Sequence, residues 1–567
     1  MLKKILRQFF CLWIFVSGCA FSEVHDHEFD DGSQIRLGAL TPVQTDNLVL
    51  LGKVWGFIKY HHPVVTTGQK QWDFELLRIL PQVLAAPDRA AAETVMHQWI
   101  EKLGPIADCK PCSTLDAKEL QLAPKLEWLN DTGLLKEDLN RIYARRSAAA
   151  EQFYVTQVPN IGNPQFANEL PYKDIQFPDA GFQLLSLFRF WNIIEYWAPY
   201  RDQIGEDWDG VLRQSIARVT LARSRQSYEL EMIAVIARIH DTHANLWSSL
   251  AVRPPVGDCS LPVVVRFVEG RAVVTAYADE EAGKASGLQV GDMIEAMDGS
   301  PVDKLIQAWR PYYAASNEPT RLRDMARGFG AGACGPLAVR VRRASGPQEL
   351  TATRVSRTLL RRPTTHDRAG DTFQLLPDNI AYIKLSSIKR TDIPTYMKLA
   401  AASKGLIIDI RNYPSDFVPF ALGQHLLDRP TDFVRFTVGD LSNPGAFHWG
   451  AQLKIEPQQP HYAGKVMILL DETSQSQSEF TAMALRIGVR AKVIGSTTAG
   501  ADGNISPFSL PGGLSSMISG IGVFYPGKQP TQGVGILPDI EVKPTIRGIR
   551  AGLDEVLDAA IAEIRRD

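Results

Sequence analysis

The chain has 567 residues, a length that accommodates about three or four domains of ordinary size. Hydrophobic residues make up 45 % of it and charged residues 22 %, which is the composition of a globular protein. The formal net charge of -2 shows no basic excess, so the composition argues against nucleic acid as a partner.

The first residues have the pattern of a bacterial export signal. A basic start, 1–7, precedes an apolar run, 9–16, that is too short to span a bilayer. The run ends in Val-Ser-Gly-Cys, which resembles a bacterial lipobox with Cys19 as the lipidated residue, while cleavage after Ala20 is the alternative. We therefore expect residues 1–19 to direct export. The mature chain is predicted on the periplasmic side of a bacterial cell envelope, lipid-anchored, or otherwise secreted. No other stretch is apolar enough to span a membrane.

Two later segments, 50–77 and 186–212, resemble each other. Each predicts an amphipathic helix, a turn with proline and a second helix that begins at Trp-Asp, followed by a third helix near 93–103 or 229–239. The expected architecture is a duplicated helical region: one copy at 20–147, a linker rich in Pro, Asn and Gln at 148–179, and a second copy at 180–255. Five identical pairs share one offset: Trp55 and Trp191, Tyr60 and Tyr196, Pro63 and Pro199, Trp72 and Trp208, Asp73 and Asp209.

The second copy alone is followed by the motif His240-Asp241-Thr242-His243. This difference suggests one duplicated scaffold with a single functional copy. The alternative is a helix C-terminus, where the helix dipole favours histidine.

Residues 256–356 change to a strand pattern, and 282–299 resemble the second half of a PDZ domain. PDZ domains bind a peptide as an added strand and hold its terminal carboxylate in a backbone nest. A helical insertion is expected at 315–335. Cys259 and Cys334 flank the domain and are candidates for a disulfide.

Cys109 and Cys112 suggest a local disulfide or free thiols rather than a metal site, because no second Cys or His pair completes one.

The segment 466–503 has the pattern strand, polar turn, helix, strand. The apolar run 466–470 predicts a buried strand, and the turn 471–478 is rich in serine. Such a turn exposes a serine hydroxyl, and the free N–H groups at the start of the next helix can stabilise an oxyanion. A Ser/Thr helix cap without chemistry is the alternative.

The PDZ-like segment and three motifs after it together resemble the family of C-terminal processing peptidases and the tricorn core protease. The motifs are Asp409-x-Arg411-Asn412-x-Pro414, Ser474-x-Ser476-x-Ser478-Glu479 and Gly535-Ile536-x-Pro538-Asp539, in the order that the family has. The resemblance covers about 186–542. It implies that 357–567 is an α/β peptidase domain of the crotonase-like type with βαβ units, in an α+β multidomain protein.

The same resemblance assigns roles to individual residues. It implies that Ser476 is the nucleophile, with oxyanion donors at the N–H of Gln477 and at Ser415 or Asp416. The lysine base of the processing peptidases falls on Ala501, which excludes a Ser-Lys dyad, whereas the histidine of the tricorn branch falls on His243. The glutamate of that branch falls on Gln532, which can hydrogen-bond but cannot stabilise an imidazolium by charge. Asp241 and Asp502 are the fallback candidates for this third group.

The expected function is a serine endopeptidase that cleaves peptides or unfolded protein through an acyl-enzyme on Ser476, with His243 as base. The alternative is a catalytically impaired scaffold that binds peptides through the PDZ-like domain and the cleft. A third reading is acyl transfer on a non-peptide ester. No cofactor or metal is expected, membrane contact is expected only through a lipid anchor, and the oligomeric state is left open.

Overall fold

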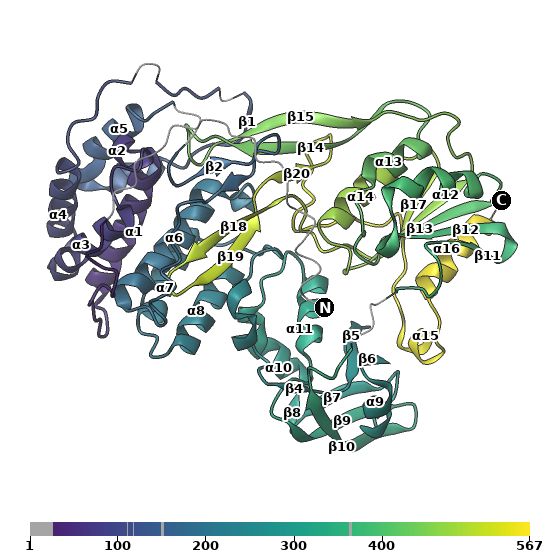
Figure 1. Cartoon of the computed structure of the whole chain (residues 1–567). Coiled ribbons are helices and arrows are strands. Elements are labelled where there is room, and N and C mark those ends of the chain that lie inside the picture. The colour runs from purple at the N-terminus through teal and green to yellow at the C-terminus, as the bar shows by residue number, and fades with distance from the viewer. Residues whose placement is uncertain (1–25, 110–111, 117, 149–151, 362–365, 567) are drawn as a thin grey trace.

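The structure is a computed structural model that describes residues 26–109, 112–116, 118–148, 152–361 and 366–566. The predicted export signal and Cys19 lie outside the described residues. Figure 1 shows a helical region (residues 42–252) on the left, a small β-domain (residues 259–356) at the bottom and an α/β domain (residues 373–566) on the right. The expected mixture of helices and sheets is confirmed. In the described part of the chain, no helix has both the length and the hydropathy to cross a membrane.

The helical region contains two runs of three long helices. The third helix of each run begins earlier than predicted, because Asp88 and Ser224 act as N-caps and accept from the amides of Ala91 and Ser227. The first run is α1 (Pro42–His61), α3 (Trp72–Ala85) and α4 (Arg89–Glu101); the second is α6 (Ala180–Trp197), α7 (Trp208–Thr220) and α8 (Arg225–Ala237). The shorter helices are α2 (Pro63–Thr66) and α5 (Lys136–Ala144).

A reciprocal pair of tryptophan bonds joins the first two helices of each run. Trp55 Nε1 donates to the Trp72 carbonyl at 3.1 Å, and Trp72 Nε1 donates back at 2.9 Å. Trp191 and Trp208 repeat the arrangement at 2.8 and 3.2 Å. The four indoles are buried, so these bonds satisfy N–H groups that water does not reach. The two segments therefore share their helix order and this contact.

The segment 148–179 is not a linker, in contrast to the sequence-based expectation. It contains the short strands β2 (Thr156–Gln157) and β3 (Pro164–Gln165), and the Glu169 carboxylate is fully buried. Glu169 accepts from Lys59 Nζ at 2.7 Å and from Arg189 Nε at 2.8 Å. A buried carboxylate needs such partners. Since Lys59 belongs to α1 and Arg189 to α6, Glu169 packs between the two helical runs and binds both.

The β-domain is an antiparallel sheet with strand order β4-β10-β9-β7-β6-β5, and β8 pairs with β7. The strand β5 lies at one edge, and the helix α11 packs against it. A disulfide joins Cys259 to Cys334, as the sequence suggested. The elements are β4 (Cys259–Ser260), β5 (Val263–Val268), β6 (Arg271–Tyr277), α9 (Glu280–Ala285), β7 (Met293–Met297), β8 (Ser300–Pro301), α10 (Val302–Trp309), α11 (Glu318–Gly328), β9 (Gly335–Arg343) and β10 (Gly346–Ser356).

The α/β domain is built on a six-stranded sheet of order β11-β12-β13-β16-β17-β21, in which only β11 runs antiparallel to its neighbour. Alternate side chains of β16 enter two core clusters, one with α14 and one with α16. This burial on both faces explains the unbroken apolar run 466–470. The strands are β11 (Phe373–Leu376), β12 (Ile380–Lys384), β13 (Gly405–Asp409), β16 (Lys465–Leu470), β17 (Ala491–Gly495) and β21 (Ile540–Glu541). The helices are α12 (Ile393–Ala400), α13 (Pro419–Gly423), α14 (Gln477–Arg486), α15 (Ile546–Arg550) and α16 (Glu555–Arg565).

Two excursions of the α/β domain enter the helical region. The long hairpin β14 (Thr431–Gly439) and β15 (Phe447–Ile455) pairs with β20 (Gly522–Phe524) and with β1 (Leu120–Leu122), as seen along the top of Figure 1. The hairpin β18 (Ile505–Leu510) and β19 (Leu514–Ser519) contributes side chains to the core of the helical region. The C-terminal part of the chain is therefore not spatially separate from the helices.

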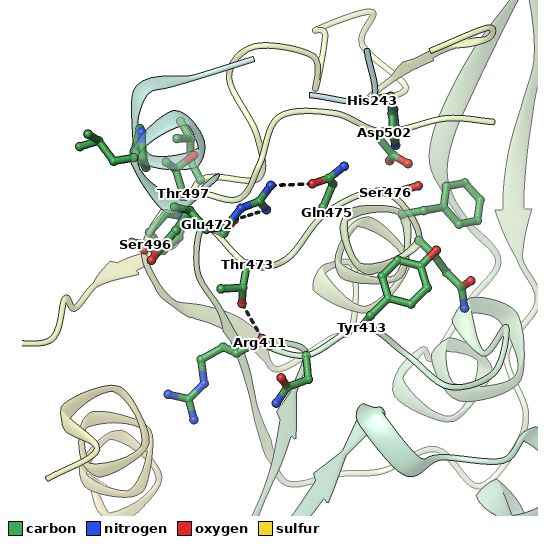
Figure 2. Close-up of a pocket in the computed structure, with 18 of the residues that line it drawn as sticks. His243, Arg411, Tyr413, Glu472, Thr473, Gln475, Ser476, Ser496, Thr497 and Asp502 are labelled. Carbon is green, nitrogen blue, oxygen red and sulfur yellow. Dashed lines mark hydrogen bonds between the residues drawn. The ribbon is translucent and has the colours of Figure 1, made fainter. Parts of the chain in front are cut away.

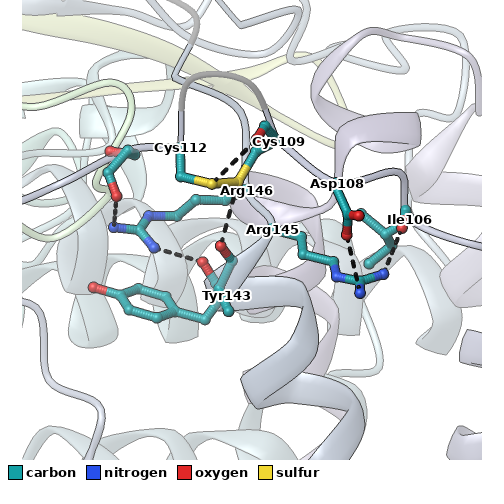
Figure 3. Close-up of a disulfide and its surroundings, with 9 residues drawn as sticks. Ile106, Asp108, Cys109, Cys112, Tyr143, Arg145 and Arg146 are labelled. Atoms are coloured by element: carbon teal, nitrogen blue, oxygen red, sulfur yellow. Dashed lines mark hydrogen bonds and ion pairs between the residues drawn. A yellow bond between two sulfur atoms is a disulfide. The ribbon is translucent and has the colours of Figure 1, made fainter.

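A second disulfide joins Cys109 to Cys112, close to the contact between the helical region and the β14–β15 hairpin (Figure 3). Arg146 lies beside it, with its guanidinium carbon 3.9 Å from the centre of the Tyr143 ring. Arg146 Nε also donates to the Ser442 carbonyl, in the loop of that hairpin, at 3.1 Å.

Candidate active site

Ser476 occupies the turn between β16 and α14 with φ +57° and ψ -119°. This left-handed conformation is strained for a residue with a side chain and costs about 1–3 kcal/mol, so the surroundings must enforce it. Glu479 does so from inside the domain: its carboxylate accepts from the Ser476 amide at 3.1 Å, from Gly500 at 2.8 Å and from Ala501 at 3.0 Å. The Ser476 amide also donates to the Ala501 carbonyl at 3.0 Å. Glu479 is thus a positioning residue that ties the turn to the loop after β17.

The three serines of the motif have different environments. Ser474 is fully buried and its hydroxyl donates to the Ile410 carbonyl at 2.9 Å, which joins the turn to the end of β13. Ser478 is also fully buried, on the inner side of α14. Ser476 alone lines the large cleft of the molecule. Exposure and backbone strain therefore both select the middle serine.

The cleft has a volume of about 1900 Å³ and is lined by residues of all three regions. It includes His243 from the helical region, Arg266 from the β-domain and Ser476 from the α/β domain. Figure 2 shows His243, the Asp502 carboxyl group and Ser476 following one another along one side of it. The structure thus brings together the two residues that the sequence predicted as nucleophile and base.

A hydrogen-bonded chain orients His243. Its Nδ1 lies 2.8 Å from the Ser519 hydroxyl oxygen, and that hydroxyl donates to Asp241 Oδ1 at 3.0 Å. Because the Ser519 proton goes to Asp241, the oxygen accepts from Nδ1–H, which leaves Nε2 as the basic nitrogen. Asp241 also accepts from the amides of His243 at 3.0 Å and Ser519 at 2.7 Å. A serine from β19 therefore mediates between the acid and the imidazole.

Gln532 forms no hydrogen bond with His243, Ser519 or Asp241 in the described part of the chain. It lines a small separate cavity with Asp241 and Ser316, and its Nε2 lies 3.4 Å from the Ser316 hydroxyl oxygen. Asp241, which the sequence offered only as a fallback, has a carboxylate oxygen 3.7 Å from His243 Nδ1. The structure therefore places a carboxylate, and not Gln532, beside the imidazole. His240 points elsewhere and pairs with Glu206 at 3.1 Å.

Asp502 is a second acid in the cleft and is almost fully buried. One carboxyl oxygen accepts from the Gly503 amide at 2.7 Å, and the other has no partner among the described residues. Burial, reinforced by the negative charge of Glu479, raises the pKa of Asp502 well above its usual value. The Asp502 carboxyl group therefore favours its neutral form and does not stabilise an imidazolium by charge.

The predicted oxyanion donors differ in position. The Gln477 amide begins α14, next to Ser476, and Gln477 lines the cleft. Ser415 and Asp416 are not among the described residues that line it, and the Ser415 amide donates to the Leu385 carbonyl at 2.9 Å. The Asp416 carbonyl accepts from Gln477 Nε2 at 2.8 Å, which holds the two turns together.

Sequence reasoning missed two residues of this site. Ser519 carries no signal, because only the docking of β19 brings it to His243. Tyr413 occupies the variable position of the Asp-x-Arg-Asn-x-Pro motif, and its ring lines the cleft near Ser476 (Figure 2). Its place inside this motif was the only indication in the sequence.

The acid limb of the pH–activity profile is expected below pH 6.5. Burial lowers the pKa of His243 from its ordinary value of 6.5, and the attraction of Asp241 only partly opposes this. Since neutral His243 is the active form, kcat/KM should stay constant at neutral pH and fall as the pH drops through the lowered pKa. Asp241→Asn should shift the acid limb to lower pH, because it removes the charge that raises the pKa of His243. A wild-type midpoint at or above 6.5 would contradict the assignment.

A family model matches the part of the chain that holds Ser476. The model of Peptidase family S41 matches residues 379–542, which include the turn after β13 and the Ser476 turn. No curated protein sequence matches the chain.

Several solved structures resemble the molecule. Mature CPAF complexed with lactacystin is 15 % identical over 68 % of this chain and 99 % of its own, with a TM-score of 0.53. The photosystem II D1 C-terminal processing protease is 16 % identical over 64 % of this chain and 92 % of its own, at 0.38. The tricorn protease is 16 % identical over 68 % of this chain and 37 % of its own, at 0.34.

The CPAF likeness shows a shared fold, and the family model covers the segment that holds Ser476. Residues 379–542, which hold Ser476, therefore match peptidase family S41, and the enzyme class that this match supports is a serine-type peptidase, a hydrolase.

Proposed function

We propose that this protein is an endopeptidase that cleaves peptides or unfolded protein through an acyl-enzyme on Ser476. The observation that carries the proposal is the strained Ser476 facing a cleft that His243 also lines, with Asp241 and Ser519 behind the imidazole. His243 Nε2 accepts the serine proton as Oγ attacks the carbonyl carbon, and it later protonates the leaving amine. The Gln477 amide stabilises the oxyanion.

The edge strand β5 supports a peptide as the substrate. All residues from Val264 to Val268 line the cleft, and their free edge is a template for one more strand. We propose that this β-domain acts as a PDZ-like module and that an extended substrate adds to β5 on its way to Ser476. The two helical runs, with their matched tryptophan bonds, are proposed to be a duplicated scaffold that carries His243 only in its second copy.

Aromatic side chains next to Ser476 favour a large apolar residue in the substrate. Phe417, Phe436 and Phe480 line the cleft, and the rings of Phe417 and Phe436 each stack on Phe480 with centroids 6.0 Å apart. Phe417 is 48 % exposed, so part of its apolar surface is open to a ligand. Burying a substrate side chain against these rings would contribute about 1.5–3 kcal/mol.

Phe417→Ala should lower kcat/KM about 10-fold for a peptide with phenylalanine at the cleavage site. The same peptide with alanine there should lose less than about 2-fold. Phe177→Ala, which truncates another half-exposed ring outside the cleft, is the matched control. Equal losses for both peptides would show that Phe417 acts on folding rather than on specificity.

Labelling with a fluorophosphonate probe tests the proposed function directly. An activated serine attacks the phosphorus, so the wild type should be labelled on the peptide that contains Ser476, and Ser476→Ala should not be. Peptide binding without labelling or hydrolysis would support the scaffold alternative instead.

We also propose that the mature protein is attached to a bacterial cell envelope through a lipid on Cys19, as the lipobox-like residues before it suggest. The mass of the mature N-terminal peptide checks this, and a free N-terminus at Phe21 would disprove it.

A further inference from the structure

Of the two backbone amides expected as the second oxyanion donor, one is engaged elsewhere and neither belongs to a described residue that lines the cleft. The Ser415 amide already donates to the Leu385 carbonyl, and neither Ser415 nor Asp416 is among the described residues that line the cleft. The Gln477 amide remains as one donor. A single donor leaves part of the negative charge of a tetrahedral intermediate uncompensated, so a second group is needed on the same side.

Tyr413 is a side-chain candidate for that second donor. It lines the cleft together with Ser476 and Gln477. Figure 2 shows the tyrosine ring on the wall opposite His243, with the Ser476 side chain between them. The residue belongs to the turn after β13, which Ser474 and Gln477 tie to the Ser476 turn.

We propose that the Tyr413 phenol is the second oxyanion donor, in the reaction inferred under the proposed function. When a substrate carbonyl enters, its oxygen accepts from the Gln477 N–H and from the Tyr413 O–H. The Tyr413 hydroxyl thus replaces the Ser415 amide, which already donates to the Leu385 carbonyl.

Acylation of Ser476 moves one electron pair and one proton. The Ser476 oxygen forms a bond to the carbonyl carbon, the carbonyl π pair moves onto the oxygen, and the serine proton passes to His243 Nε2. The two donors hold the oxyanion without transferring a proton. When the intermediate collapses, the C–N bond breaks and the leaving amine takes the proton from His243, which gives the acyl-enzyme.

The protonation state of the phenol agrees with this role. Burial raises the pKa of Tyr413 above its usual value, although its contacts with Ser476 and Gln477 oppose the rise. The hydroxyl therefore keeps its proton at neutral pH, where His243 is neutral and able to act as base.

Tyr413→Phe tests the proposal, because it removes the hydroxyl and keeps the ring. On a fluorogenic peptide, kcat should fall about 10²–10³-fold while KM changes less than about 2-fold. A peptidyl aldehyde, which forms a tetrahedral adduct with a serine, should lose affinity by a similar factor. The matching peptide alcohol, which forms no adduct, should bind both variants equally. Tyr525→Phe is the matched control, since it removes a phenol that contacts Arg486 outside the cleft.

Two outcomes would overturn the proposal while the wild type is labelled by the fluorophosphonate. Activity of Tyr413→Phe within about 3-fold of the wild type would show that the hydroxyl is not a donor. Higher activity would show that Tyr413 blocks the oxyanion site. If the wild type is neither labelled nor active, the proposed function fails first, so the two failures are distinguishable.

Discussion

Ser476→Ala should reduce peptide hydrolysis by a factor on the order of 10⁶, because it removes the atom that forms the acyl-enzyme. His243→Ala should cost nearly as much, since a serine hydroxyl is a weak nucleophile at neutral pH without a base. The double variant should lose no more than either single variant, because the two residues act in the same step. Initial rates on an unstructured fluorogenic peptide measure all three losses.

His240→Ala is the matched control for this experiment. His240 lies in the same loop, but its ring pairs with Glu206 and forms none of the hydrogen bonds that join His243, Ser519 and Asp241. Most of the activity should therefore remain. If His243→Ala kept near-full activity while Ser476→Ala was inactive, the base would lie elsewhere and the assignment of His243 would be wrong.

Trp55→Ala and Trp191→Ala should each destabilise the helical region by about 3–5 kcal/mol. Each indole is at most 3 % exposed and exchanges two hydrogen bonds with a second tryptophan, so truncation leaves a cavity and removes a buried hydrogen bond. The midpoint of denaturant unfolding, followed by helical circular dichroism, measures the loss.

Two further variants make this result interpretable. Leu359→Ala, at a side chain 67 % exposed, should change the free energy of unfolding by less than about 0.5 kcal/mol. Trp191→Phe keeps most of the buried area and should cost less than Trp191→Ala, which provides a folded variant if the alanine variants do not accumulate. Losses equal to that of Leu359→Ala would refute the buried tryptophan pairs.

Local sequence patterns determined much of the catalytic domain. The unbroken apolar run 466–470 predicted a buried strand. The structure confirms it, because the side chains of this strand enter cores on both faces of the sheet. The serine-rich turn and the helix after it follow from neighbouring residues, since caps and turn chemistry act over a few positions. The family motifs then indicated Ser476 and His243, and the structure places both in one cleft.

Other features depend on residues that are far apart in the chain. The segment 148–179 has a linker composition, yet Glu169 packs inside because Lys59 and Arg189 neutralise it. Ser519 reaches Asp241 and His243 because the β18–β19 hairpin buries its apolar side chains among the helices. Gln532 lines a small cavity that is separate from the cleft with Ser476.

The sequence by itself therefore determined the strand–turn–helix that holds the nucleophile, because helix, strand and turn preferences are set by adjacent side chains. The tertiary structure alone decided which acid supports the base, that Ser519 lies between them, and that Tyr413 lines the cleft with Ser476. These choices follow from long-range burial. Apolar surfaces far apart in the chain pack together, and the polar groups carried with them must then find partners away from water.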